Sequence, residues 1–235
     1  MSEPAVADHR GLVERVRRNL DIVHDRIQTA GGQPEATRIV AVTKGFGPEY
    51  VAAAMACGLV EIGENYAQEL LEKARVLGAR PASLDPHWHF VGSLQRNKVR
   101  LLAPLVSIFQ SVDRLDLGET LARRAPGATV FVQVNLTNET QRGGCPIDAT
   151  PRLVARLGEL GLHVRGLMAV APLASAEKVQ EGFRAVRVLA DKLELPERSY
   201  GMSDDLEIAV GEGATTVRLG TSLFGARPVR RRLRR

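Results

Sequence analysis

The chain has 235 residues, of which 44% are hydrophobic, 25% are charged and only 4% are aromatic. This composition is typical of a packed protein with an aliphatic core, and it excludes a collagen-like, disulfide-dense or mainly disordered chain. No apolar run approaches the roughly 18 residues of a membrane span, and the N-terminal segment has no signal-peptide pattern. The two cysteines, Cys57 and Cys145, stand far apart in the sequence. We therefore expect a cytoplasmic protein without a membrane anchor.

The formal net charge of +5 originates at the end of the sequence. Without the six arginines of residues 227–235 the chain is close to neutral: Arg227, Arg230, Arg231, Arg232, Arg234 and Arg235. We predict one domain over residues 1–227 and a solvated arginine-rich tail over residues 228–235, and we expect no nucleic-acid partner. Binding of the tail to nucleic acid or to an anionic surface is the alternative.

Short β-branched segments alternate with stretches that carry helix signals. A first helix is expected at roughly Gly11–Ala30, and others are indicated after Pro48, over Ala149–Gly161 and over Ser175–Leu193. The expected strands are Arg38–Thr43, Leu59–Gly63, His87–Gly92, Val106–Val112, Thr129–Asn135, His163–Val170, Arg198–Met202 and Thr215–Gly220.

Several of these strands are almost continuously apolar, as expected of a parallel sheet buried on both faces. Alternation of strands and helices indicates an α/β fold, and the number of strands favours closure. The sequence therefore predicts a (β/α)8 TIM barrel, which typically takes about 250 residues, with one extra N-terminal helix. An open doubly wound sheet is the structural alternative.

Polar residues follow the predicted strands at their C-terminal ends, where (β/α)8 barrels place their functional sites. They are residues 43–45, 63–66, His89, 92–93, Asn135, Ser203 and 218–221.

Lys44 directly follows the first predicted strand. Partial desolvation at a barrel mouth lowers the pKa of a lysine, and its neutral amine can form a Schiff base with an aldehyde. An exposed lysine without such a role is the alternative.

The segments after the last two strands form a candidate phosphate site. Gly220 would let the backbone approach an anion, and Ser203 and Thr221 would offer hydroxyl donors, although the same hydroxyls could simply cap helices. Arg218 lies two residues before Gly220, so strand alternation places its side chain inside the barrel, where it needs a partner. The lysine, the phosphate site and the interior arginine together suggest pyridoxal 5′-phosphate (PLP). A sugar-phosphate aldolase would share the first two elements.

Six segments between about residue 10 and residue 227 resemble, in order, the pyridoxal phosphate homeostasis protein family (the YggS/PROSC type). They are IVAVTKGF (39–46), IGENYAQEL (62–70), WHFVGSLQRNK (88–98), VNLTNETQRGG (134–144), RGLMAVAP (165–172) and GMSDDLEIAV…GATTVRLGTSLFGAR (201–227). The resemblance implies a fold type III PLP-binding barrel, related to the alanine racemase N-terminal domain, without a metal.

The same resemblance implies roles for individual residues. Lys44 would be the Schiff-base lysine and Arg218 would face the pyridine nitrogen. The cofactor phosphate would be held by Ser203, Gly220 and Thr221, and Asn65 would line the pocket. Two positions depart from the family, because Tyr200 replaces a methionine and Arg142 replaces a lysine.

The resemblance further implies a non-catalytic protein that buffers or delivers PLP inside the cell, affects amino-acid and keto-acid balance, and has apo PLP-dependent enzymes as recipients. The alternatives are an amino-acid racemase or other weak amino-acid enzyme, and a barrel that does not use PLP. Racemisation needs a second acid/base opposite Lys44, which fold-related racemases take from a tyrosine of a C-terminal β-domain that also forms their dimer. The sequence shows no such domain after the barrel, so we expect a monomeric carrier.

Overall fold

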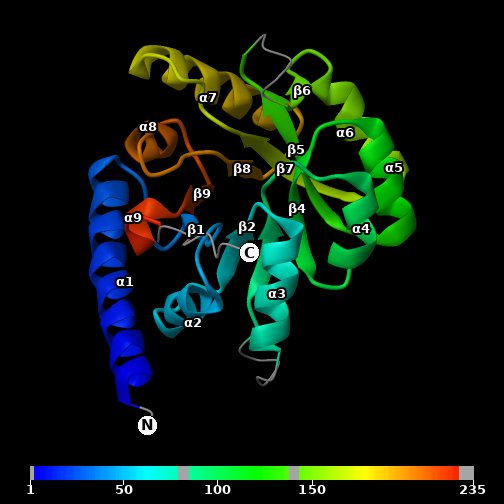
Figure 1. Cartoon of the computed structure of the whole chain (residues 1–235). Coiled ribbons are helices and arrows are strands. Elements are labelled where there is room, and N and C mark those ends of the chain that lie inside the picture. The colour runs from blue at the N-terminus through cyan, green and yellow to red at the C-terminus, as the bar shows by residue number, and fades with distance from the viewer. Residues whose placement is uncertain (1–2, 79–84, 138–142, 228–235) are drawn as a thin grey trace.

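The computed structural model describes residues 3–78, 85–137 and 143–227. A barrel of parallel strands is built from β1 (Arg38–Val42), β2 (Glu61–Glu64), β3 (His87–Phe90), β4 (Val106–Val112), β5 (Thr129–Asn135), β7 (His163–Ala169), β8 (Glu197–Ser199) and β9 (Thr216–Leu219). The barrel is closed, because β1 pairs with both β2 and β9 and β4 pairs with β5 (Figure 1). The predicted (β/α)8 barrel is confirmed, and the open sheet is wrong.

The predicted strands agree closely with the observed ones, except that β8 ends at Ser199 rather than at Met202. Gly201 causes the early end, because its φ of 97° lies in the left-handed region and interrupts extended backbone. A Cβ on Gly201 would lie 2.5 Å from the Cβ of Ala209, so a larger residue would clash. One further strand, β6 (Cys145–Pro146), pairs with the end of β5 and is absent from the sequence prediction.

Helices surround the barrel (Figure 1). They are α1 (Glu3–Thr29), α2 (Pro48–Ala56), α3 (Ala67–Leu77), α4 (Arg96–Leu102), α5 (Leu115–Arg124), α6 (Thr150–Glu159), α7 (Ala176–Lys192), α8 (Leu206–Gly211) and α9 (Thr221–Phe224). The extra N-terminal helix, α1, begins earlier than predicted and packs against α2, α8 and α9. The first and last elements of the described chain therefore support the same side of the barrel.

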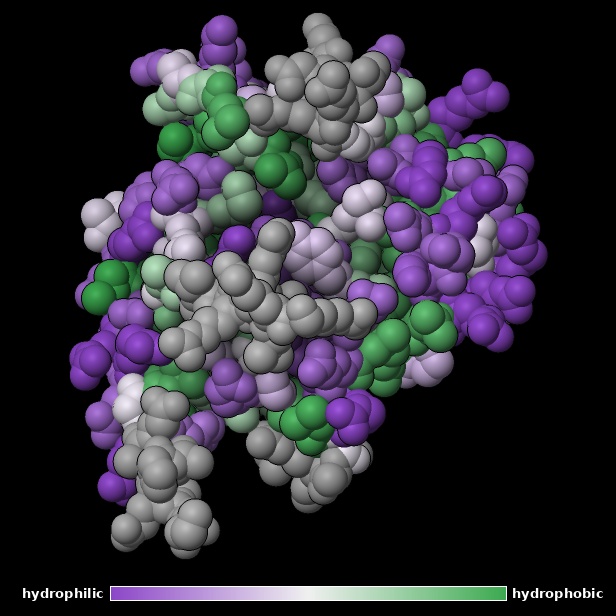
Figure 2. Space-filling view, in the orientation of Figure 1, coloured by the Kyte–Doolittle hydropathy of each residue, from purple (hydrophilic) through white to green (hydrophobic). Residues whose placement is uncertain are grey.

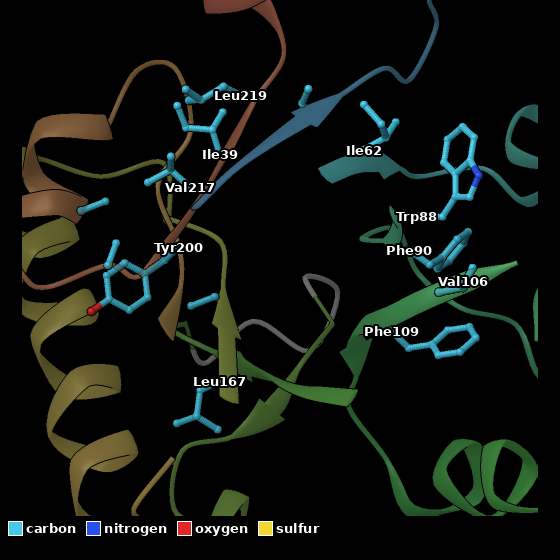
Figure 3. Close-up of a cluster of buried hydrophobic side chains, with 14 of the residues drawn as sticks. Ile39, Ile62, Trp88, Phe90, Val106, Phe109, Leu167, Tyr200, Val217 and Leu219 are labelled. Atoms are coloured by element: carbon cyan, nitrogen blue, oxygen red, sulfur yellow. The ribbon is translucent and has the colours of Figure 1, made fainter. Parts of the chain in front are cut away.

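Alternation along the strands separates two sets of buried side chains. Val217 and Leu219 belong to the hydrophobic cluster between the barrel and its helices, whereas Arg218 between them is directed into the barrel, as predicted. Figure 3 shows Tyr200 directed toward a helix on one side and Trp88 on the far side of the same cluster. The main hydrophobic cluster is thus mostly aliphatic and lies between the barrel wall and the helices, whereas the barrel interior contains polar residues as well as apolar ones.

Candidate cofactor site

A cavity of about 430 Å³ opens at the C-terminal end of the barrel. It brings together all six candidate residues, which are Lys44, Asn65, Ser203, Arg218, Gly220 and Thr221. The rest of the lining consists of Val42, Phe46, Val91, Val170, Met202, Asp204 and Arg227. Residues from the first strand and from the last strand of the barrel therefore face one space.

Lys44 extends from the end of β1 and is partly buried at the cavity. Its pKa is lowered, first by burial and then by the positive charges of Arg227 and Arg218, while Glu64 opposes the shift. The neutral amine is consequently a larger fraction of Lys44 than of an exposed lysine at the same pH. This state favours reaction with an aldehyde.

A buried ion pair supports the backbone that carries this lysine. Lys73 of α3 is 3% exposed and forms an ion pair with Glu64, which is fully buried at the end of β2. Lys73 Nζ also donates to the carbonyl oxygen of Thr43 (2.7 Å), and Thr43 Oγ1 donates to Glu64 Oε1 (2.8 Å). Gly45 N donates to Glu69 Oε2 at 2.7 Å. Breaking the Lys73–Glu64 pair would leave an uncompensated buried charge, which is costly. These contacts therefore fix the turn on both sides of position 44.

Lys73 was not predicted from the sequence. The partner atoms belong to residues 43 and 64, which only the fold brings to α3. A signal was nevertheless present, because Lys73 lies on the same buried face of α3 as Leu70 and Leu77. A lysine within an apolar helix face indicates a buried partner.

Arg218 forms the floor of the cavity and is 6% exposed. Its Nη1 donates to the Ser199 carbonyl (2.7 Å) and to Ser199 Oγ (2.8 Å), and its Nη2 donates to the Ala169 carbonyl (2.7 Å). Burial lowers the pKa of Arg218 to about 10, so the guanidinium remains a cation at neutral pH. Among the described residues its hydrogen-bond partners are uncharged oxygens.

The two candidate hydroxyls, those of Ser203 and Thr221, meet at the same cavity. Thr221 Oγ1 donates to Ser203 Oγ (2.9 Å), and the backbone N–H of Ser222 donates to the same oxygen (3.1 Å). The Ser203 hydroxyl proton is therefore available to an anion in the cavity. Neither hydroxyl caps its own helix, because α8 and α9 have Asp205 and Gly220 at their N-caps without side-chain capping bonds. Ser203 instead accepts a first-turn N–H of α9, that of Ser222, so its hydroxyl also serves the N-terminus of a neighbouring helix.

Asn65 follows β2 and is held by backbone contacts. Its N–H donates to Glu64 Oε2 at 3.1 Å. Its carbonyl oxygen lies 2.1 Å from the position that a Cβ on Gly92 would occupy. Position 92 therefore requires glycine, because any side chain would push Asn65 away from the cavity.

Tyr200, one of the two departures from the family pattern, lies outside the site. It is fully buried, stacks on Phe183 with ring centroids 4.6 Å apart, and donates from its hydroxyl to the Glu212 carbonyl at 2.8 Å. Burial raises the pKa of the Tyr200 phenol well above its usual value. The other departure, Arg142, lies outside the described residues.

Two polar residues expected at the barrel mouth line other parts of the molecule. His89 is fully buried and is bonded to Glu61 and Gln110, because it faces inward one position before the end of β3. Asn135 lies at a separate pocket with Pro146. Within the described parts of the chain, no cluster of side chains could hold a metal ion and no helix is long and apolar enough to cross a membrane.

Comparison with known proteins defines the class of this barrel. A family model described as "Alanine racemase, N-terminal domain" matches residues 13–228. Alanine racemase from Corynebacterium glutamicum has a TM-score of 0.70 at 14% sequence identity, over 93% of this chain and 62% of that chain, which shows a shared fold. The protein therefore has the (β/α)8 barrel of the alanine racemase type.

Closer relatives narrow the class to one family. The pyridoxal phosphate homeostasis protein of Pseudomonas aeruginosa is 39% identical over 225 residues, covering 92% of this chain and 96% of the relative. The protein of the same name from Escherichia coli (strain K12) is 35% identical over 229 residues, covering 90% and 97%. The structure of PipY from Synechococcus elongatus, with PLP bound, is 33% identical with a TM-score of 0.75, over 86% of this chain and all of that chain. The chain belongs to the pyridoxal phosphate homeostasis protein family.

Proposed function

We propose that this protein binds pyridoxal 5′-phosphate at the barrel mouth and carries the cofactor rather than using it in catalysis. The observation that supports this most directly is the convergence of the Lys44 amine, the Ser203–Thr221 hydroxyl pair and the Arg218 guanidinium on one cavity. A relative that is 33% identical has been solved with PLP bound. The side chains that line the cavity and the PLP-bound relative therefore support the same cofactor.

The residues fit the cofactor group by group. When bound, PLP supplies an aldehyde that condenses with an amine and releases water, and Lys44 has the most suitable amine in the cavity because its pKa is lowered. Ser203, Thr221 and the backbone at Gly220 would hold the dianionic phosphate through hydroxyl and N–H donors. Arg218 would face the pyridine nitrogen, and Asn65 would border the ring.

Two features of the cavity bear on the choice between a carrier and an enzyme, and the first, Arg218, does not by itself exclude racemisation, because racemases of this fold share the arginine. A cation beside the pyridine nitrogen disfavours protonation of that nitrogen and so weakens the ring as an electron acceptor. Racemisation also needs acid/base groups on both faces of the substrate. The chain's three tyrosines, Tyr50, Tyr66 and Tyr200, all lie in the described residues and none lines the cavity. The one carboxylate among the described lining residues, Asp204, is exposed.

The covalent link can be tested directly. Reduction of the PLP-loaded protein with borohydride, followed by peptide mapping, should place the adduct on Lys44, and Lys44→Ala should abolish it. Lys98→Ala, which changes a lysine outside this cavity, is the matched control. An adduct on another lysine in the wild-type protein would refute the assignment. Residual non-covalent binding in Lys44→Ala would be consistent with an intact phosphate site.

Two parallel assays distinguish a PLP carrier from a PLP-dependent enzyme. A carrier should transfer PLP to an apo PLP-dependent enzyme and should show no turnover in a racemase screen of common amino acids. Racemase activity that is lost in Lys44→Ala would favour the enzyme instead, and Asp204→Asn would then test the exposed carboxylate as second acid/base. Apo-enzyme recipients and a cytoplasmic location are parts of the proposal.

A further inference from the structure

A continuous series of hydrogen bonds crosses the interior of the barrel and ends at Arg218. It links Glu61 of β2, His89 of β3, Gln110 of β4, Ser199 of β8 and Arg218 of β9, and we call these five side chains the barrel network. The successive donor–acceptor distances are 2.6, 2.6, 2.7 and 2.8 Å. His89, Gln110 and Ser199 have no solvent exposure or nearly none. Water therefore cannot replace a missing partner readily.

The donor–acceptor order of the barrel network follows from Arg218, which can only donate. Its Nη1 donates to Ser199 Oγ, so the single Ser199 proton is directed to Gln110 Oε1. The Gln110 amide nitrogen then faces His89 Nδ1, which must accept. His89 consequently carries its proton on Nε2 and donates to Glu61 Oε2. All four bonds point the same way, from the cation to the carboxylate.

Only one protonation state of His89 is compatible with this order. A second proton on His89 Nδ1 would require the Gln110 amide to turn over and present its oxygen. The Gln110 nitrogen and Arg218 would then both donate to Ser199 Oγ, and the Ser199 proton would have no acceptor within the network. An unsatisfied buried donor is costly. The network therefore holds His89 in the neutral Nε2–H form.

The ends of the barrel network carry opposite charges. Arg218 has no carboxylate among its described hydrogen-bond partners, and Glu61 at the far end is a carboxylate. Burial raises the pKa of Glu61, but its bonds to His89 and to exposed His87 outweigh burial and lower it. Arg38 lies 3.9 Å from the same carboxylate and adds positive charge there. Aligned bonds between a cation and an anion polarise one another and become stronger.

We propose that Glu61, His89, Gln110 and Ser199 are positioning residues that act through Arg218, fixing its guanidinium so that its remaining N–H groups face the cofactor cavity. This inference deepens the proposed PLP site and names residues on the opposite end of the barrel as part of its support. The order of hydrogen bonds can be tested in the protein without cofactor, so its failure is distinct from failure of PLP binding.

The first test is the tautomer of His89, measured by NMR of protein labelled with ¹⁵N-histidine. The network predicts an unprotonated Nδ1 and a protonated Nε2 in the pH range around neutrality. The groups that face His89 are Glu61 on one side and Gln110 on the other, with His87 and Arg38 beyond Glu61. A protonated Nδ1 in this range would overturn the proposal.

The second test changes the hydrogen bond between Gln110 and His89. In Gln110→Glu a carboxylate faces His89 Nδ1, so both ring nitrogens face carboxylates and His89 should become doubly protonated at neutral pH. The matched control is His87→Gln, which removes a histidine bonded to the same Glu61 (3.4 Å) but outside the network. The control should leave the His89 signals unchanged. A neutral His89 in folded Gln110→Glu would contradict the predicted order.

The third test asks whether the network positions Arg218. Gln110→Met removes both central bonds, and Ser199→Ala removes one hydroxyl with little change in volume, which guards against a folding failure in the first variant. Each should shift and broaden the Arg218 guanidinium N–H signals and shift the absorption maximum of bound PLP, whereas His87→Gln should change neither. Unaltered Arg218 signals in folded Ser199→Ala and Gln110→Met would refute the positioning role. A wild-type protein with the predicted signals but without PLP binding would instead refute the proposed function.

Discussion

Arg227 is an exposed residue with an influence on Lys44. Its positive charge is the second cause, after burial, of the lowered Lys44 pKa. Arg227→Gln should raise that pKa, so less neutral amine is present at neutral pH and covalent attachment of PLP becomes slower. The pH–rate profile should move to higher pH by less than about one unit, because an exposed charge is screened by solvent.

Stopped-flow absorbance as a function of pH measures this effect. Arg96→Gln, which removes an exposed arginine paired with Asp116 elsewhere on the barrel, is the control. A profile for Arg227→Gln that coincides with that of the control would mean that burial alone sets the Lys44 pKa.

Tyr200 stabilises the contact between the barrel and its helices without touching the cofactor cavity. Tyr200→Phe removes the hydroxyl bond to the Glu212 carbonyl but keeps the stacking on Phe183. We expect the free energy of unfolding to fall by about 1–2 kcal/mol, since a buried carbonyl loses its donor. Tyr200→Met should cost more, because the stacked ring is lost as well.

Denaturant unfolding measures the free energy of unfolding of both Tyr200 variants. The absorption spectrum of bound PLP should match that of the wild type in each. An altered spectrum in folded Tyr200→Phe would show that the barrel wall at this position is coupled to the site.

Some site residues were predictable from the sequence and others were not, for a physical reason. Lys44 follows a strand directly and Arg218 is fixed by strand alternation, so local pattern suffices to assign them to the barrel mouth and interior. His89 was wrongly expected at the barrel mouth. It lies within β3, which ends at Phe90, and its side chain is buried inside the barrel. Lys73 and Gln110 become informative only through partners on other elements, which the barrel closure supplies.

At the scale of elements, α1 supports the side of the cavity that we propose to hold the cofactor phosphate. Arg26 in its last turn donates to the Ser203 carbonyl (3.0 Å) and pairs with Glu207 of α8, and Asn19 Nδ2 donates to the Leu223 carbonyl of α9 (2.8 Å). Arg26→Gln should therefore loosen the loop that carries Ser203. The Kd for PLP should rise by less than about tenfold, because a partly exposed ion pair is worth at most about 1 kcal/mol.

Titration calorimetry with PLP measures this change. Arg18→Gln, on the exposed face of the same helix, is the matched control. Equal affinities in the two variants would show that Ser203 is held without α1.

The closed order of strands was accessible from the sequence because each strand is a short apolar run with a helical segment after it. The early end of β8 was not, because it arises from the left-handed φ of Gly201 and its close contact with Ala209. The length of α1 was also underestimated, since its first residues lack an apolar periodicity that would mark a helix.

For the whole molecule, the arginine-rich tail is predicted to be dispensable for the barrel. Residues 228–235 lie outside the described residues. Truncation after Arg227 removes five arginines and should change neither the melting temperature nor the PLP spectrum appreciably, because exposed terminal residues seldom contribute packing. A large fall in melting temperature in differential scanning calorimetry would show instead that the tail docks on the barrel.

Oligomeric state is a second property of the whole molecule, and we predict a monomer. Figure 2 shows a mostly hydrophilic face on which hydrophobic residues form small, separate patches, whereas stable dimers usually bury a continuous apolar area. Sedimentation equilibrium with and without PLP tests this prediction, and a mass of twice the monomer would contradict it.

Closure of the barrel through β1 and β9 has a consequence for how the protein is made. Lys44 follows the first strand of the barrel to be synthesised, whereas Arg218 and Thr221 belong to or follow the last barrel strand, and the two strands are direct neighbours. A nascent chain therefore has no complete binding pocket until nearly all of the barrel has been synthesised. PLP therefore has no complete site to bind during the early stages of folding, and the pairing of strands so distant in the sequence is expected to be slow.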